Sequence, residues 1–164
     1  MKLPPARTIG LLVVCIAIPL LVGVIGSVFT MSEITTWYAG LLKPPFNPPD
    51  WIFGPVWTLL YILMGIALWF VLREGTGTRN VRVAAILFAA QLVANLVWSV
   101  LFFGMHQIAA SSIEVFILLG LIVATIVSFR RISKTAGWLL VPYLCWTTFA
   151  TVLTFSIWLL NGPA

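Results

Sequence analysis

The chain has 164 residues, of which 62% are hydrophobic and only 8% are charged. Soluble domains carry about 25% charged residues, so a protein with a mean hydropathy of +1.12 has too few polar groups to cover its surface in water, and the lipid bilayer is its natural solvent. The formal net charge of +5 does not indicate nucleic-acid binding, because the cations lie in short gaps between apolar segments, where they orient membrane proteins.

Five apolar segments are each long enough to cross a bilayer, which takes roughly 20 residues of α-helix. Open strands cannot satisfy their backbone in lipid, and no alternating pattern indicates a barrel, so each segment is expected to be helical. The sequence therefore predicts one all-α membrane domain over residues 1–164, a five-transmembrane-helix bundle. The expected spans are residues 8–30, 51–72, 83–104, 108–129 and 138–160, with a structured loop at 31–50.

The positive charges fall almost entirely on one side of this five-span arrangement, and Lys43 stands alone on the other side. Because loops rich in Lys and Arg stay in the cytoplasm, we expect a cytoplasmic N terminus, an outward C terminus and an outward-facing loop at 31–50. The cations on the first side are Lys2, Arg7, Arg73, Arg79, Arg82, Arg130, Arg131 and Lys134.

The loop between the first two spans combines prolines with aromatic rings, in the run WYAGLLKPPFNPPDWIFGPVW at residues 37–57. Its two proline pairs, which begin at Pro44 and Pro48, fix φ and remove backbone donors, so neither helix nor strand is expected there. An aromatic belt at the membrane interface accounts for the rings but not for the prolines. We interpret the loop as a rigid lid over a ligand site, with Pro44 among the contact residues.

A stripe of rings on the second span is predicted to face this site. Phe53, Trp57 and Tyr61 recur at every fourth position and share one helix face. Trp57 lies about 9 Å along the helix from Trp51, at 1.5 Å per residue, which is deeper than an interfacial belt residue needs to be. Packing between helices is the alternative for such a stripe.

The fifth span repeats this spacing with Pro142, Trp146 and Ala150. The proline is expected to kink the helix, because it frees a backbone carbonyl. A small Ala150 one turn beyond Trp146 would then leave a slot beside the indole, where a flat aromatic ligand could stack.

The third span carries Gln91, Asn95 and Ser99 at every fourth position, with Trp98 beside them. Asn95 lies about 13 Å from the outer end of its helix. An amide at that depth must find partners, because an unsatisfied polar group in hydrocarbon costs several kcal/mol. Two interpretations stay open, namely interhelical hydrogen bonding, worth about 1 kcal/mol per bond, and contact with polar atoms of a mostly apolar ligand.

Alanines at four-residue spacing on the same span would let helices approach closely. They serve either packing within the bundle or a homodimer contact. These residues are Ala85 with Ala89, and Ala90 with Ala94.

Glu114 is the only acid well inside an apolar segment. Intramembrane carboxylates commonly couple protons or balance a ligand charge, although Glu114 is close enough to the outer end of its span to snorkel or to bond Ser111. His106, the sole histidine, lies in a tight turn without companion ligands, so no metal site is predicted. No Ser/His/Asp set, carboxylate pair or phosphate loop indicates a catalytic site.

Three motifs occur in order along the five spans: WYxxLxKPxxxPPxWxFxPVW at 37–57, NLVWSVLFFGM at 95–105 and WLLVPYLCWTTFA at 138–150. Together they resemble the TspO/MBR family, the tryptophan-rich sensory or translocator proteins, called peripheral-type benzodiazepine receptors in animals. The resemblance covers nearly the whole chain.

The resemblance implies a five-helix bundle, often dimeric, that binds porphyrins such as protoporphyrin IX and haem as ligands and requires no cofactor. Animal members end in a Tyr and Arg sterol motif, which the tail SIWLLNGPA lacks, so a prokaryotic member in a cell membrane is expected and tight cholesterol binding is not. The ligand contacts implied by the family are Tyr38, Trp57, Asn95, Trp146 and Ala150, to which we add Trp98.

Three functions follow as hypotheses. The leading one is a tetrapyrrole-binding sensor or translocator-type protein of the membrane, without enzyme activity. The second is a proton-coupled transporter of porphyrins or other amphiphiles, with Glu114 carrying the proton. The third is a light-dependent porphyrin-degrading catalyst, for which the resemblance implicates Trp57 and Trp146.

Overall fold

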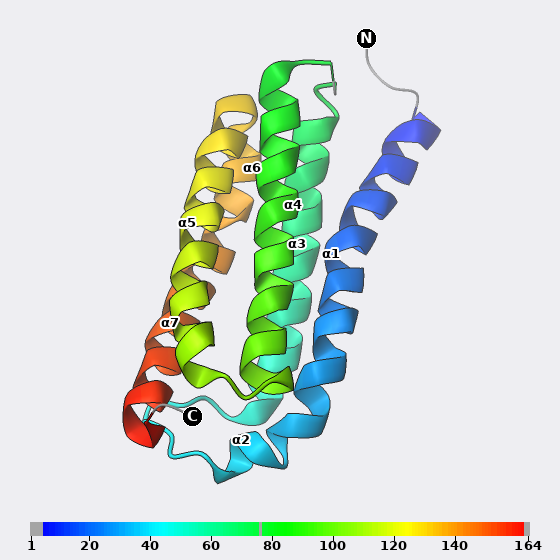
Figure 1. Cartoon of the computed structure of the whole chain (residues 1–164). Coiled ribbons are helices and arrows are strands. Elements are labelled where there is room, and N and C mark those ends of the chain that lie inside the picture. The colour runs from blue at the N-terminus through cyan, green and yellow to red at the C-terminus, as the bar shows by residue number, and fades with distance from the viewer. Residues whose placement is uncertain (1–4, 76, 163–164) are drawn as a thin grey trace.

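The structure, a computed structural model, describes residues 5–75 and 77–162, and helices make up most of it (Figure 1). Five helical segments are long and apolar enough to cross a membrane: Thr8–Ile34, Asp50–Leu72, Arg79–Gly104, Ile108–Ile132 and Lys134–Asn161. The predicted all-α bundle of five spans is confirmed. The elements are α1 (Pro5–Ile34), α2 (Trp37–Gly40), the 3₁₀ turn η1 (Asp50–Ile52), α3 (Phe53–Leu72), α4 (Arg79–Ser99), the π turn η2 (Val100–Gly104), α5 (Ile108–Ile132), α6 (Lys134–Leu139) and α7 (Val141–Asn161).

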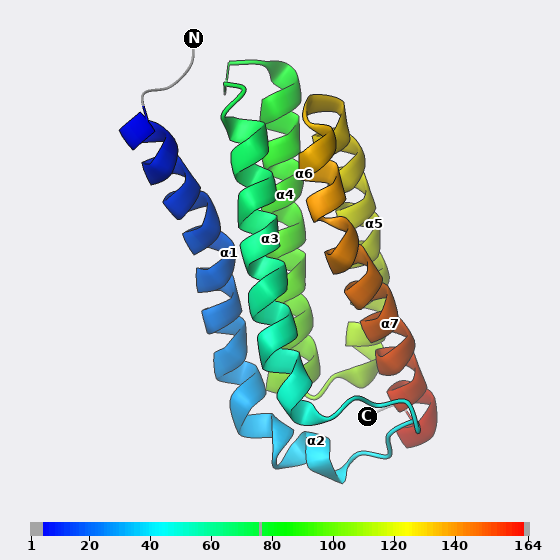
Figure 2. The same ribbon diagram turned by 180° about the vertical axis from the view of Figure 1, so that it is seen from behind.

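The spans run side by side and alternate in direction (Figures 1 and 2). α1 packs on α3 and α4, and α5 packs on α4, α6 and α7. The α3–α4 turn and the α5–α6 corner lie at the end where α1 begins. α2 and the end of α7 lie at the opposite end. We call residues 37–52, which cross that opposite end, the roof.

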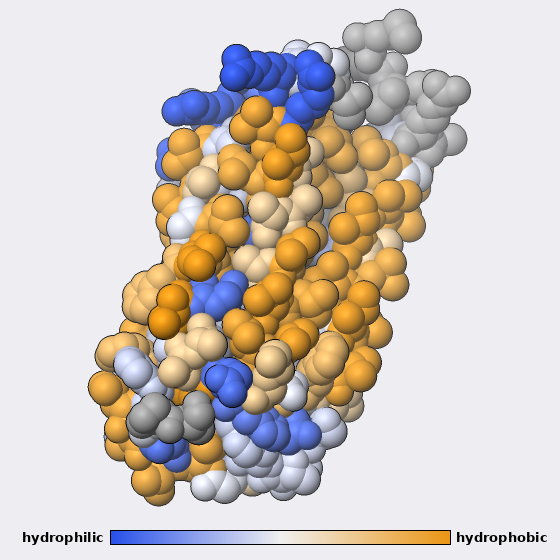
Figure 3. Space-filling model, viewed as in Figure 1, coloured by the Kyte–Doolittle hydropathy of each residue, from blue (hydrophilic) through white to orange (hydrophobic). Residues whose placement is uncertain are grey.

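Exposed cations gather at the end of the bundle away from the roof. The space-filling view shows hydrophilic residues at that end and hydrophobic residues along the sides (Figure 3). Ile9, Val13 and Val28 on α1 are each more than half exposed, as expected for a face that contacts hydrocarbon. Which end faces the cytoplasm stays a prediction from the charges. The exposed cations are Arg73, Arg79, Arg82, Arg130, Arg131 and Lys134.

α1 and α3 touch backbone to backbone at one point. Pro19 inside α1 has no N–H, so the carbonyl of Cys15 lacks its helical partner. Gly65 packs here, because a Cβ at this position would collide with the backbone of Ile16 and lie 2.7 Å from the Cys15 oxygen. Glycine therefore allows a close helix contact where α1 has a free carbonyl.

The fifth span differs from its prediction. α6 ends at Leu139, and Leu140 separates it from α7, so the chain crosses as two helices in succession. Pro142 lies in the first turn of α7, where the missing N–H would have no helical partner in any case. The predicted kink within one continuous helix is therefore wrong, since the proline begins a helix instead.

The expected loop at 31–50 is partly helical, because α1 extends into it and α2 covers residues 37–40. Residues 41–49 contain neither helix nor strand, as the proline pairs predict. The third span ends in η2, where the N–H of Met105 donates to the carbonyl of Val100 at 2.8 Å.

Candidate functional site

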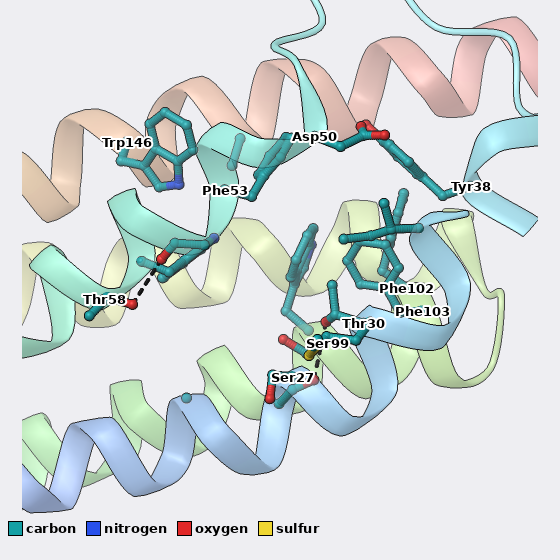
Figure 4. Close-up of a pocket in the computed structure, with 18 of the residues that line it drawn as sticks. Ser27, Thr30, Tyr38, Asp50, Phe53, Thr58, Ser99, Phe102, Phe103 and Trp146 are labelled. Atoms are coloured by element: carbon teal, nitrogen blue, oxygen red, sulfur yellow. Dashed lines mark hydrogen bonds between the residues drawn. The ribbon is translucent and has the colours of Figure 1, made fainter. Parts of the chain in front are cut away.

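A cavity of about 470 Å³ lies inside the bundle beneath the roof (Figure 4). Its lining residues come from the second half of α1, α2, η1, the first half of α3, the end of α4 with η2, and the middle of α7. Small-molecule sites commonly measure about 300–1,000 Å³, so an organic ligand fits by size. The aromatic lining residues are Tyr38, Trp51, Phe53, Trp57, Tyr61, Trp98, Phe102, Phe103 and Trp146.

Trp57 on α3 and Trp146 on α7 line the same cavity from two different spans. Trp57 stacks on Tyr61, one turn along α3, with ring centroids 5.6 Å apart and planes at 30°. Trp146 meets Phe53 edge to face at 5.9 Å. Ala150, one turn beyond Trp146, also lines the cavity. The structure thus brings together the rings that four-residue spacing singled out on separate spans.

Trp98 forms the part of the wall where α4 passes into η2. Its indole is nearly parallel to the ring of Phe102, with centroids 5.3 Å apart and planes at 9°. Phe103 meets the same indole edge to face at 6.0 Å. The π turn places Phe102 and Phe103 on the cavity side together, which the four-residue spacing of an α-helix does not predict for adjacent residues.

Tyr38 of α2 closes the cavity at the roof. It is 4% exposed, and its hydroxyl donates to Oδ1 of Asn47 at 2.7 Å. Burial raises the pKa of Tyr38 to about 12. The nearby Asp50 carboxylate adds to this rise, and the hydrogen bond with Asn47 opposes it. The predicted contact residue Pro44 is buried within the roof and is not among the lining residues.

Asn95 joins three spans directly behind the cavity wall. The Tyr61 hydroxyl donates to Oδ1 of Asn95 at 2.8 Å, and Nδ2 of Asn95 donates to the Tyr143 hydroxyl at 3.4 Å. Asn95 is 2% exposed and is not among the lining residues, whereas Tyr61 is. The structure thus shows the interhelical hydrogen bonds, and a direct contact of Asn95 with a ligand stays a prediction.

Glu114 on α5 is only 9% exposed and lies outside the cavity lining. Its Oε2 is buried and has no hydrogen-bond partner within the part of the chain that the structure describes. Ser111, considered above as its partner, donates instead to the carbonyl of Ile108 at 2.9 Å. A buried carboxylate oxygen without a partner is costly in free energy, and a proton-carrying role for Glu114 stays a prediction.

Two contacts at the roof end of the bundle were not predicted from the sequence. The first joins the roof to α7, since Oδ1 of Asn161 accepts from the N–H of Leu42 and Nδ2 of Asn161 donates to its carbonyl, both at 2.9 Å. An amide at the end of an apolar span could have signalled such a contact, but the partner could not be read from local sequence.

The second unpredicted contact joins the end of α1 to the turn before α5. Nε2 of His106 lies 3.1 Å from Oε2 of Glu33. The imidazole also stacks on the indole of Trp37, with centroids 4.2 Å apart and planes at 13°. His106 has φ of 56°, in the left-handed region that non-glycine residues rarely occupy. Sequence reasoning considered His106 only as a metal ligand and missed this role.

The cavity is open on the side where α1 approaches η1 and α3. Val24 on α1 and Trp51 on η1 are lining residues, yet they are 62% and 73% exposed. Gly54 at the start of α3 also lines the cavity, and nothing lies within 4 Å of where its Cβ would be. Because these residues belong to segments that are long and apolar enough to span a membrane, we expect the opening to face hydrocarbon.

The four alanines of α4 do not form one surface. Ala94 is buried within the bundle, Ala89 is exposed, and Ala85 and Ala90 are half-buried. Helix packing therefore uses Ala94, and a homodimer contact through the other three stays a prediction.

Comparisons with known proteins agree with the motif pattern. The model of the TspO/MBR family matches residues 15–159. The Tryptophan-rich protein TspO of Chlorobaculum tepidum is 49% identical over 150 residues, which cover 92% of this chain and 95% of that protein. The Translocator protein of Homo sapiens is 38% identical over 135 residues, with 82% and 80% covered. The Tryptophan-rich sensory protein of Cereibacter sphaeroides is 41% identical over 126 residues, with 76% and 77% covered.

Proposed function

The chain belongs to the TspO/MBR family, and we propose that it binds a tetrapyrrole such as protoporphyrin IX or haem within the membrane and acts as a sensor or translocator for that ligand. The observation that carries the proposal is the cavity beneath the roof, which the indoles of Trp57 and Trp146 line from separate spans. The ligand is bound without enzymatic turnover, and no cofactor is required.

The chemistry of the cavity supports a flat, apolar guest. Its aromatic rings offer faces and edges for offset stacking and edge-to-face contact with a macrocycle. A micromolar Kd corresponds to about 8 kcal/mol, and burial of apolar surface contributes about 25 cal/mol per Å². Burying about 330 Å² of the macrocycle would therefore supply that much, before the cost of association is subtracted.

The carboxylates of a porphyrin would lie toward the outside of the roof. Lys43 is the only cation of the roof, and its Nζ lies 4.6 Å from the ring centroid of Tyr38, outside the cavity lining. Burying an unpaired carboxylate in hydrocarbon costs free energy. We therefore expect a partly exposed pose, with the carboxylates near Lys43 and the macrocycle between the indoles.

Titration of protoporphyrin IX into the detergent-purified protein, followed by porphyrin absorbance, tests this function. A double variant, Trp57→Ala with Trp146→Ala, should lower the affinity about tenfold or more, because each aromatic contact contributes about 0.5–1.5 kcal/mol. Trp138→Ala is the matched control, since Trp138 is 61% exposed and contacts Arg130 at the other end of the bundle. Equal affinities in the double variant and the control would rule out this cavity as the site.

A proton-coupled transporter of porphyrins or other amphiphiles is the second candidate, favoured by the unpartnered Oε2 of Glu114. It requires uptake into liposomes that a pH gradient drives and that Glu114→Gln abolishes. Glu74→Gln, an exposed acid at the other end, controls for the loss of one charge. Uptake that does not depend on the pH gradient, or that persists in Glu114→Gln, would contradict proton-coupled transport and favour the binding function.

The proposal also includes a location and an assembly. The protein resides in a prokaryotic cell membrane with its N terminus in the cytoplasm and its C terminus outside, according to the charge bias. A homodimer would form through the exposed and half-buried alanines of α4, which are Ala85, Ala89 and Ala90.

A further inference from the structure

Asp50 is the only charged side chain among the described residues that line the cavity. It is the first residue of η1 and follows the second proline pair. Figure 4 shows it at the roof side of the cavity, close to Tyr38. Its carboxylate contributes to the raised pKa of the Tyr38 hydroxyl. Asp50 is exposed and forms no ion pair within residues 5–75 and 77–162, so no cation of the protein neutralises its charge.

The nearest basic group of the roof does not offset this charge inside the cavity. Lys43 directs its ammonium group to the carbonyl of Ala39 at 3.3 Å and over the ring of Tyr38. It is not a lining residue. The other Lys and Arg residues whose side chains the structure describes lie at the opposite end of the bundle, one length of the 20-residue α3 away. That length is about 30 Å at 1.5 Å per residue, well beyond the screening length of about 8 Å at physiological salt.

The hydroxyl groups of the wall point their hydrogens away from a ligand. Ser27 donates to the carbonyl of Val24 at 2.7 Å, and Thr58 donates to that of Gly54 at 2.9 Å. Thr30 does the same within α1. Because each hydrogen is used within its own helix, the hydroxyl oxygens present lone pairs rather than donors to the cavity. These oxygens can accept from a donor on the ligand, whereas the buried indole N–H groups of Trp98 and Trp146 have no partner among the described residues and can donate to an uncharged acceptor.

We propose that Asp50 is a specificity-determining residue of this site and selects ligands by charge. The cavity favours flat apolar molecules that carry an amine or another cationic group at the roof, and it disfavours a carboxylate at the same place. This inference rests on the proposed function, because it assigns the chemical class of ligand to the same site. For a porphyrin, it means that the carboxylates are kept outside the cavity rather than bound within it.

Three probes with the same macrocycle and different charge test the selection. They are mesoporphyrin IX, an anion, its neutral dimethyl ester, and its diamide with N,N-dimethylethylenediamine, a cation at pH 7. Each affinity is measured in non-ionic detergent on the full chain, Asp50→Asn, Asp50→Glu and Glu74→Gln. The neutral ester reports any change in the shape of the cavity, so affinities for the charged probes are expressed relative to it.

The full chain should bind the cation more tightly than the anion. Asp50→Asn should weaken binding of the cation and strengthen binding of the anion by about twofold to fivefold each, as expected for an exposed charge. Asp50→Glu should keep the wild-type preference, and so should Glu74→Gln, which removes the same charge at the far end. Raising the salt concentration should shrink the preference in the full chain.

The outcomes separate this inference from the function beneath it. If the neutral ester fails to bind the full chain, the tetrapyrrole site itself is wrong. If the ester binds and Asp50→Asn leaves the ratio of cation to anion affinity unchanged, the cavity binds porphyrins and Asp50 does not select among them. A shift of equal size in Glu74→Gln would show a general effect of net charge and would overturn the assignment to Asp50.

Discussion

The side chain of Asn161, at the end of α7, forms two hydrogen bonds of 2.9 Å with the backbone of Leu42, 119 positions earlier in the chain. One bond uses the Leu42 N–H and the other its carbonyl, so a single amide satisfies both polar groups of one roof residue. Since α7 also carries Trp146 and Ala150, this pair connects the roof to the helix that forms one wall of the cavity.

Asn161→Ala should loosen the roof and speed ligand release. The two lost hydrogen bonds contribute about 0.5–1.5 kcal/mol each, so the dissociation rate of a bound porphyrin should rise about fivefold or more. Asn161→Asp keeps the acceptor for the Leu42 N–H and loses the donor, so it should give an intermediate rate. Stopped-flow displacement measures all three rates, and identical rates would show that this contact does not hold the roof.

Ligand entry is expected to occur from the hydrocarbon side, between α1 and α3. Gly54→Trp places a large side chain in the opening, where nothing lies within 4 Å of the Cβ position. It should slow porphyrin transfer from liposomes to the protein by about tenfold or more, because the association rate falls when the entrance to the site is blocked. Gly120→Trp on α5, where the space is equally open, is the control. Equal slowing in both variants would argue against this route.

The close contact of α1 with α3 should make Gly65→Ala destabilising by about 1–3 kcal/mol, because the added methyl group meets backbone that cannot move cheaply. Gly120→Ala, with open space around its Cβ, should be neutral or stabilising by up to about 1 kcal/mol through helix propensity. Unfolding in detergent micelles compares the two variants. Similar stability would show that α1 does not depend on this contact.

Tyr38 should make the protein less stable in alkali. Its pKa is raised to about 12 in the folded protein by burial, against 10.0 for the free side chain. Between these values the unfolded chain has lost a proton that the folded chain keeps, so the free energy of unfolding falls as pH rises. Tyr38→Phe should reduce this slope between about pH 10 and 12, as measured by thermal unfolding in detergent. An unchanged slope would show that Tyr38 does not titrate in this way.

Binding without turnover predicts a limit on any photochemical loss of porphyrin. Under illumination in air, the absorbance lost should not exceed about one porphyrin per protein, because no described set of residues regenerates an oxidised site. Repeated additions of protoporphyrin to one sample count the turnovers. Many turnovers that disappear in the Trp57 and Trp146 variants would replace the binding function with the catalytic one.

The spans and the irregular roof could be predicted from the sequence because their causes are local. Hydrocarbon requires a helix of minimum apolar length, which sets the number and the place of the spans. The proline pairs at Pro44 and Pro48 remove backbone donors within residues 41–49, whatever surrounds them. The spacing of Trp57 and Tyr61 likewise puts both rings on one face of α3, where they stack.

The partners of individual side chains were decided only by the tertiary structure. The sequence left Asn95 between a ligand contact and interhelical bonding, and the structure places it between Tyr61 and Tyr143. Asp50 became the charged residue of the cavity only when η1 and α2 were brought to the same cavity by the fold. Such contacts depend on how whole helices are positioned relative to one another. Many weak packing contacts along the helices together determine that position, and no local pattern of residues encodes it.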